Sequence, residues 1–235
     1  MSTQRDARPG RYLGAAFVFQ FVTSLTAGLL SAGMLTGSPV DVVRNIASNV
    51  GQMRASIVLM LLTSAGIIVL ASLLYAVLSD QGTAVARIAL GLWMAEAVML
   101  AVKTLGLYAL VDLSLGAVDG GAVGGIALDF SRHAAQIDML FFCLGALLWY
   151  GLLFRSRIVP RLLALWGLVA VPLVLLATAL LVWDSDRDLG MALYALYIPF
   201  ELVIGVWLLV VGASAPTSGL GAGDENRTRA ISLGS

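Results

Sequence analysis

The sequence predicts an all-α fold, namely a polytopic integral membrane protein built as a six-transmembrane-helix bundle with both termini cytoplasmic. Of its 235 residues, 60% are hydrophobic and only 12% are charged, whereas soluble domains carry roughly 25% charged residues. Most charges gather in short clusters between long apolar stretches, which is the pattern of helices that cross a membrane. Fourteen basic and fourteen acidic residues give no net charge, so the composition does not predict binding to nucleic acid.

The apolar stretches define the expected helices, because crossing the hydrocarbon layer takes about 20 apolar residues. The first stretch follows three arginines but is longer than the roughly 7–15 apolar residues of a cleavable signal peptide, so we interpret it as a retained helix. We therefore expect a cytoplasmic segment over 1–11, a transmembrane domain over 12–212 and a disordered cytoplasmic tail over 213–235. The six predicted spans are 12–35, 55–78, 88–110, 134–154, 162–183 and 191–211.

The distribution of Lys and Arg predicts the orientation, because cytoplasmic loops carry the excess of basic residues. If the chain crosses the membrane at the six predicted spans, nine arginines lie on one side of the membrane and four on the other. Lys103 lies within a span. The larger group includes both ends of the chain, so both termini are expected in the cytoplasm. The two groups are Arg5, Arg8, Arg11, Arg87, Arg155, Arg157, Arg161, Arg227 and Arg229, and Arg44, Arg54, Arg132 and Arg187.

The first outer connection is expected to contain a short helix over 39–50. Ser38 is a favourable N-cap residue, and Pro39 is a favourable first helical residue. Apolar residues such as Val42 and Ile46 then recur at helical spacing, with polar residues on the opposite face. This pattern predicts an amphipathic helix that lies on the outer membrane surface. The alternative is a lid that packs over the end of the bundle.

The outer connection at 113–130 is rich in glycine. It contains Gly120, Gly121, Gly124 and Gly125 but lacks the Lys-Ser/Thr ending of a phosphate-binding loop. The spacing of Gly120 and Gly124 matches a motif for helix dimerisation in membranes. Because the segment is expected to be a loop, we interpret it as a flexible linker.

Four ionisable side chains within the predicted spans need an explanation. They are Glu96 and Lys103 in the third span, Asp138 near the outer end of the fourth, and Glu201 near the middle of the sixth. A charge at the bilayer centre costs about 2.5–3.5 kcal/mol on insertion scales, so such groups face the interior of a bundle, pair or become neutral. Glu96 and Lys103 share a helix face but lie about 10 Å apart along its axis. We expect Lys103 to be shared between Glu96 and Glu201.

Polar and small residues accompany these charges on several predicted helices. Together they are expected to line a cavity that is open to the outside and closes near the midplane, with His133, Gln136 and Asp138 at its mouth. The predicted lining also includes Tyr194, Tyr197, Glu201 and Gly205, Gln20, Ser24, Gly28 and Ser31, and Ser64, Ser72 and Tyr75.

These residues support more than one function. In one, the protein binds or transports a small or amphiphilic ligand or a proton, with candidate binding residues Glu96, Lys103, Glu201, Asp138, His133 and Tyr197. In the other, it is a structural membrane protein that stabilises another complex, and the charges serve helix packing. The alternative for His133 is an ordinary surface histidine that binds no ligand. The expected partners are membrane lipids together with such a ligand or such a membrane protein.

Catalytic motifs are absent from the sequence. It contains no HExxH, CxxC or GxSxG pattern, and its only histidine is isolated. We therefore predict no catalytic residue, no metal site and no cofactor. A mechanism with two carboxylates, Glu96 and Glu201, stays formally open.

Two longer runs resemble a bacterial membrane family known as domain of unknown function 4386. They are "RSRIVPRLLALWG" and "PFELVIGVWLLVVG", and "NVGQMRASIVLMLL" and the Arg87…Glu96 pair are similar as well. The resemblance covers roughly residues 10 to 212. The family usually has a lysine before the final glycine, where this chain has Val210 and Val211. The resemblance implies six helices in a bacterial cytoplasmic (plasma) membrane, and it implies no activity. The matching positions are Ser156, Pro160, Arg161 and Leu165; Glu201, Gly205, Trp207 and Gly212; Arg54; and Arg87 and Glu96.

Overall fold

The computed structural model describes residues 8–116, 121–183 and 196–212, and in these ranges every regular element is a helix. The predicted all-α fold is therefore confirmed for the described chain. The elements are α1 (Arg8–Ala32), α2 (Pro39–Ala47), α3 (Val50–Leu78), the 3-10 turn η1 (Ser79–Gln81), α4 (Thr83–Leu115), α5 (Gly121–Ser156), α6 (Arg161–Trp183) and α8 (Tyr197–Val211).

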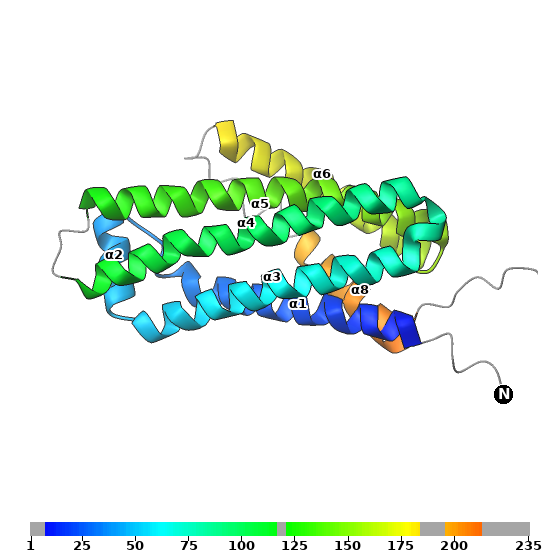
Figure 1. Cartoon of the computed structure of the whole chain (residues 1–235), viewed down its shortest axis with the longest axis horizontal. Helices are drawn as coiled ribbons and strands as arrows, with labels where there is room; N and C mark the ends of the chain where they lie inside the picture. Colours follow the sequence, from blue (N-terminus) through cyan, green and yellow to red (C-terminus); the bar gives the residue numbers. More distant parts are fainter. Residues whose placement is uncertain (1–7, 117–120, 184–195, 213–235) are drawn as a thin grey trace, which may run out of the picture.

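The long helices run side by side along the length of the molecule (Figure 1). Each of α1, α3, α4, α5 and α6 packs against the next in this order, and α8 packs against both α1 and α6. The six helices therefore close into a ring, although α8 comes last in the sequence. Because residues from the two ends of the chain meet in α1 and α8, a site inside the ring can combine side chains from distant parts of the sequence.

Five described helices, α1, α3, α4, α5 and α6, are long and apolar enough to cross a membrane by length and composition. Helix α8 is also apolar but has 15 residues. The predicted sixth span began at residue 191, and residues 191–195 lie outside the described part of the chain. The predicted cytoplasmic segments 1–11 and 213–235 lie outside it as well, except for the first residues of α1.

The prediction of a loop over 113–130 is wrong for most of that segment. Helix α4 continues to Leu115, and α5 already begins at Gly121. Two glycines in the first turns of α5 lie against α2 instead. A Cβ atom added to Gly124 would lie 3.1 Å from Cγ2 of Val43 in α2, and one added to Gly125 would lie 3.6 Å from Cγ of Pro39. Glycine therefore allows α2 to lie close against the first turns of α5.

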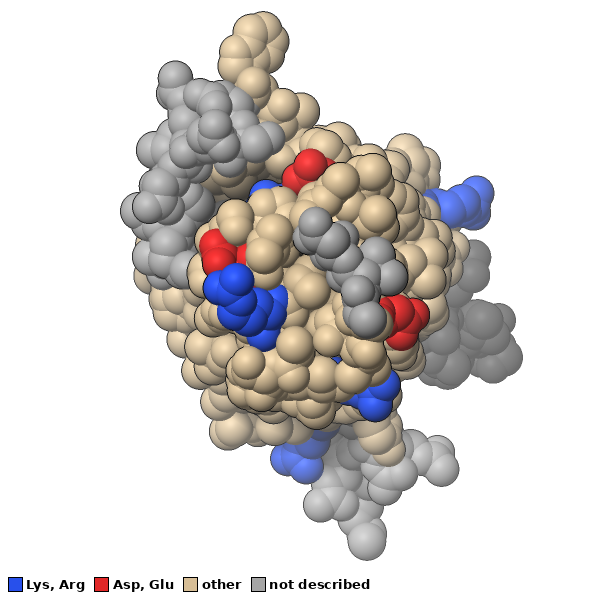
Figure 2. Space-filling view, turned by 90° about the vertical axis from the view of Figure 1, so that its left-hand side faces the viewer, with Lys and Arg blue, Asp and Glu red and all other residues tan. Residues whose placement is uncertain are grey.

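Helix α2 forms where the sequence predicted a helix, and it packs across the end of the bundle against α3, α4 and α5. Ser38 and Asp41 form a capping box at its start, and Val42 and Ile46 are fully buried. Because its apolar face contacts other helices, that face is not available to lipid tails, and the lid alternative describes it better. Figure 2 looks onto this end, which carries separate groups of both signs, including the exposed Asp41–Arg44 pair.

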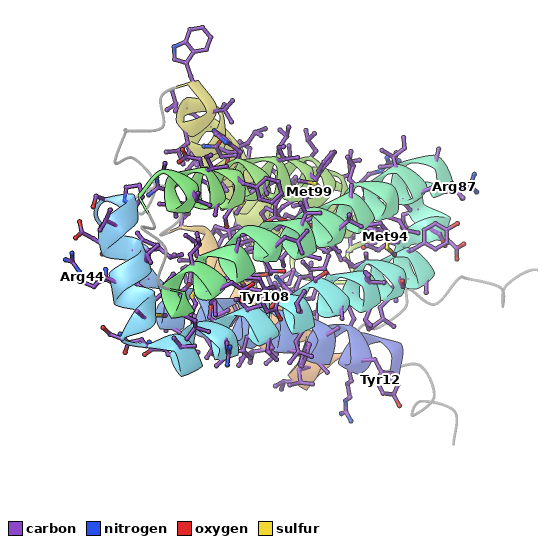
Figure 3. All side chains as sticks on the ribbon, turned by 60° about the vertical axis from the view of Figure 1, so that its left-hand side comes forward. Tyr12, Arg44, Arg87, Met94, Met99 and Tyr108 are labelled. Atoms are coloured by element: carbon purple, nitrogen blue, oxygen red, sulfur yellow. The ribbon has the colours of Figure 1, made fainter. Side chains whose placement is uncertain are left out.

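The opposite end of the bundle carries mainly basic residues. We call it the arginine end, because it holds Arg11, Arg87, Arg155, Arg157 and Arg161 at the ends of α1, α4, α5 and α6. Arg44 and Arg87 lie at opposite ends of the molecule in Figure 3.

The turn from α5 to α6 belongs to the arginine end. There the hydroxyl of Ser156 accepts a hydrogen bond from the backbone N–H of Ile158 at 3.3 Å, and Arg157 has a φ of 58°. Ile158 and Val159 are buried. This turn therefore returns two apolar side chains to the core while its arginines remain at the surface.

Candidate functional site

A polar layer separates two apolar cores within the ring. One core lies toward the arginine end and includes Phe17 and Trp149. The other lies beneath α2 and includes Ala27 and Ile46. On α1, Gln20 lies between the two cores, and polar residues occupy the same position on α3 and α4. The layer is therefore a property of the whole bundle and not of one helix.

A cavity of about 250 Å³ lies in this polar layer. Five helices, α1, α3, α4, α5 and α8, contribute to its wall, and all four ionisable residues predicted from the sequence reach it. An adjoining hollow of about 160 Å³ extends toward the α2 end, past Gly28 and Met60. The cavity is lined by Gln20, Ser24, Thr63, Ile67, Glu96, Leu100, Lys103, Asp138, Met139, Phe142, Tyr197, Ile198 and Glu201.

Lys103 interacts electrostatically with Asp138. Among the described residues, no carboxylate oxygen lies within 4.0 Å of its ammonium group, so neither glutamate forms an ion pair with it, and Asp138 acts on it from a longer distance. The predicted sharing of Lys103 between the two glutamates is therefore wrong. The reason is the position of Lys103 along the length of the bundle. The backbone carbonyl of Lys103 accepts a hydrogen bond from the Ser131 hydroxyl at 3.2 Å, so Lys103 lies beside α5, which supplies the acid.

Glu96 is buried, with 5% of its surface exposed. Its electrostatic neighbours are Asp138 and Glu201, both of which are acidic. Its Oε2 atom has no hydrogen-bond partner in the described part of the protein. Buried polar atoms in folded proteins almost always have a partner, so this oxygen needs a proton, a water molecule or a ligand.

The side chain of Gln20 on α1 interacts with the carboxyl group of Glu201. One helical turn before it, the hydroxyl of Tyr197 lies 3.1 Å from that of Tyr150. The rings of Tyr197 and Phe142 meet nearly edge to face, with centroids 5.2 Å apart at 75°. Two aromatic rings therefore lie in the cavity wall close to the carboxylates.

Other residues of the predicted lining lie elsewhere. His133 is exposed on α5 and does not reach the cavity. The side-chain amide of Gln136 donates to the carbonyl of Leu181 at 3.3 Å, and the hydroxyl of Ser72 donates to its own helix at 2.7 Å. Ser64 donates to the carbonyl of Ala97 at 2.7 Å. These side chains hold helices or face outward. Tyr194 lies outside the described residues.

The sequence did not single out Thr63, Met139 or Phe142, which also line the cavity. An apolar or hydroxyl residue in a membrane helix carries no distinctive signal. Only their helical spacing relative to Asp138 places Met139 and Phe142 near it, one and four positions away. Among the described residues, no group of three His, Cys, Asp or Glu side chains is arranged to hold a metal ion.

Comparison with known protein families gave a match over most of the chain. Residues 12–212 match the family described as Domain of unknown function (DUF4386). This match agrees with the resemblance of the two sequence runs and with its extent. No curated protein matches the chain, and no solved structure does.

Proposed function

The chain belongs to the DUF4386 family, and we propose that it is a multi-pass protein of the bacterial cytoplasmic membrane that binds or transports a small or amphiphilic ligand or a proton. The binding site is the cavity lined by Glu96, Lys103, Asp138 and Glu201. The proposal includes six helices that span the membrane, with α8 as part of the sixth. It also places both termini in the cytoplasm.

One observation supports the binding site above all. Three acidic residues and one basic residue from α4, α5 and α8 line the same cavity, and the buried Oε2 atom of Glu96 has no hydrogen-bond partner among the described residues. Charges inside membrane helices are costly and usually mark pathways for ions or substrates. A group of charges that served only helix packing would be expected to satisfy its own hydrogen bonds.

Binding is tested with the purified protein and with liposomes that contain a pH-sensitive dye. The probes are protons, decanoate and decylammonium, and the readouts are proton flux and the ligand-induced rise in melting temperature. A ligand at about 100 times its Kd stabilises the folded state by about 2.7 kcal/mol. We expect at least one probe to act on the wild type and to lose its effect in Glu201→Gln. Asp129→Asn is the matched control, because its carboxyl is 62% exposed and does not line the cavity.

If none of the three probes acts on a well-folded wild type, or if Glu201→Gln responds as the wild type does, the proposed site is wrong.

The proposed orientation is supported by the five arginines at one end of the bundle, since basic residues favour the cytoplasmic side. Arg44→Cys places a thiol on α2, where the native side chain is 72% exposed. Asp80→Cys places one in η1 at the other end. The native Cys143 is buried. A membrane-impermeant maleimide should label Arg44→Cys in intact bacteria and Asp80→Cys only after permeabilisation. The reverse pattern would contradict the orientation.

A further inference from the structure

The charges in the cavity do not balance. Glu96, Asp138 and Glu201 are acidic, and Lys103 is the one basic side chain among the described residues that line the cavity. Lys103 interacts with Asp138, so the cavity supplies no cation for Glu96 and Glu201. Two carboxylates without counter-charge are costly at this depth. Protonation of the carboxyl groups or a bound cation would remove this cost.

The two carboxylates lie close to one another in the structure. They come from α4 and α8, and together with Gln20 they also border a gap beside the aromatic core that is too narrow to hold a water molecule. Among the described residues, no donor reaches the buried Oε2 atom of Glu96. An N–H group from a bound molecule would satisfy it, and hydrogen bonds between an ammonium and a carboxylate are among the strongest in proteins.

The aromatic rings favour the same class of ligand. Phe142 and Tyr197 lie in the cavity wall, with their centroids 5.2 Å apart at 75°. The faces of such rings attract cations, and more strongly when water is excluded. The rest of the wall is largely apolar, including Ile67, Leu100 and Met139. The cavity thus offers acceptors for a charged head and an apolar surface for the group that carries it.

Size sets a limit on the ligand. The cavity measures about 250 Å³, and an engineered apolar cavity of about 150 Å³ holds benzene. A molecule with one ring, or an aliphatic chain of similar volume, therefore fits. A bare metal ion fits less well, because no cluster of three suitable ligands exists in the described part of the chain.

We propose that the cavity binds a small organic ammonium ion, with its nitrogen between Glu96 and Glu201 and its apolar part against Phe142 and Tyr197. This inference rests on the proposed function and names the ligand class of the same site. Lys103 then lies between the cavity and the hollow that leads toward α2. Its charge opposes the bound cation, and Asp138 offsets that charge.

The test is isothermal titration calorimetry of the full-length protein in detergent with three ligands of similar shape: benzylammonium, benzyl alcohol and benzoate. We expect only benzylammonium to bind. Its Kd should rise at least tenfold in Glu201→Gln, which loses one charged acceptor, and should stay unchanged in Asp129→Asn. Lys103→Met should lower the Kd, since it removes a positive charge from the cavity wall. The comparison of the three ligands on the wild type decides the question even if a variant does not fold.

Two outcomes would overturn the ammonium assignment and leave the proposed function standing. One is binding of benzoate that disappears in Lys103→Met, which would make the ligand an acid held by the lysine. The other is equal affinity for benzyl alcohol and benzylammonium, which would mean that charge plays no part. If none of the three ligands binds and the flux and melting experiments above also detect no probe, both proposals are wrong.

Discussion

Replacing Glu96 by leucine should stabilise this protein. The side chain is 5% exposed, its Oε2 atom has no partner among the described residues, and its electrostatic neighbours are acidic. Glu96→Leu keeps a similar volume and removes the unsatisfied oxygen. If the charges existed to hold the helices together, the same substitution would weaken the fold. An increase in stability would therefore favour a binding site, and a decrease would favour a purely structural role for these charges.

The expected magnitude follows from the one unsatisfied atom. A buried polar atom without a partner costs about 1–3 kcal/mol, and Glu96→Leu should recover an amount in this range. For a chain of this length, 1 kcal/mol shifts the melting temperature by about 2–4 °C. The melting temperature should therefore rise by about 2–12 °C. Glu96→Gln should give a smaller change, because its amide still needs an acceptor.

Cys143 provides the assay for this prediction. It is the one cysteine in the chain and is fully buried, so a thiol-reactive dye becomes fluorescent only when the bundle opens. Asp138→Leu is the comparison, because it removes the acid that interacts with Lys103 and should lower the melting temperature. A lower melting temperature in Glu96→Leu, with the protein folded at room temperature, would refute the reasoning.

Four further substitutions test helix packing, helix capping and one hydrogen bond. In Gly106→Ala the new Cβ would lie 2.7 Å from a backbone oxygen of α5, so the variant should lose about 1–3 kcal/mol in thermal melts. Gly91→Ala on the same helix has nothing within 4 Å and should gain up to about 1 kcal/mol. Hydrogen bonds from Ser38 lower the pKa of Asp41, so its stabilisation of α2 is present at neutral pH and lost as the pH falls below about 4. Hydrogen exchange corrected for intrinsic rates should therefore be faster in α2 of Asp41→Ala than in the wild type at pH 7, and the difference should shrink as the pH falls below about 4. Tyr150→Phe should cost about 0.5–1.5 kcal/mol through the lost hydrogen bond to Tyr197, and an unchanged melting temperature would contradict that contact.

Hydropathy was sufficient to locate most of the helices, because long apolar runs have few alternatives to a helix in a membrane. It failed at 121–130, where the glycines suggested a loop. Glycine is unfavourable in an isolated helix, yet Gly124 allows the backbone of α5 to approach α2. That contact joins segments about 80 residues apart in the sequence. It therefore cannot be predicted from the residues near Gly124 alone.

The sequence was sufficient to predict which ionisable residues form the site, but not which of them interact with one another. The cost of burying charge brought Glu96, Lys103, Asp138 and Glu201 to attention, and all four line one cavity. Helical periodicity gives the face on which a side chain lies but not the neighbouring helix that it meets. Lys103 was therefore assigned to Glu96 and Glu201, although the acid that interacts with it is Asp138 on α5. His133 shares a helix with Asp138 but is exposed to the surroundings.

The polar layer between the two apolar cores also has a mechanical consequence. Each core consists of packed apolar side chains, whereas the polar layer surrounds the cavity of about 250 Å³. A bend of the bundle at that height disturbs neither core, so we expect backbone amides there to exchange faster than those above and below. A ligand in the cavity would then stiffen the bundle at that level. Ligand binding and the bending of the bundle would therefore be linked within one protein chain.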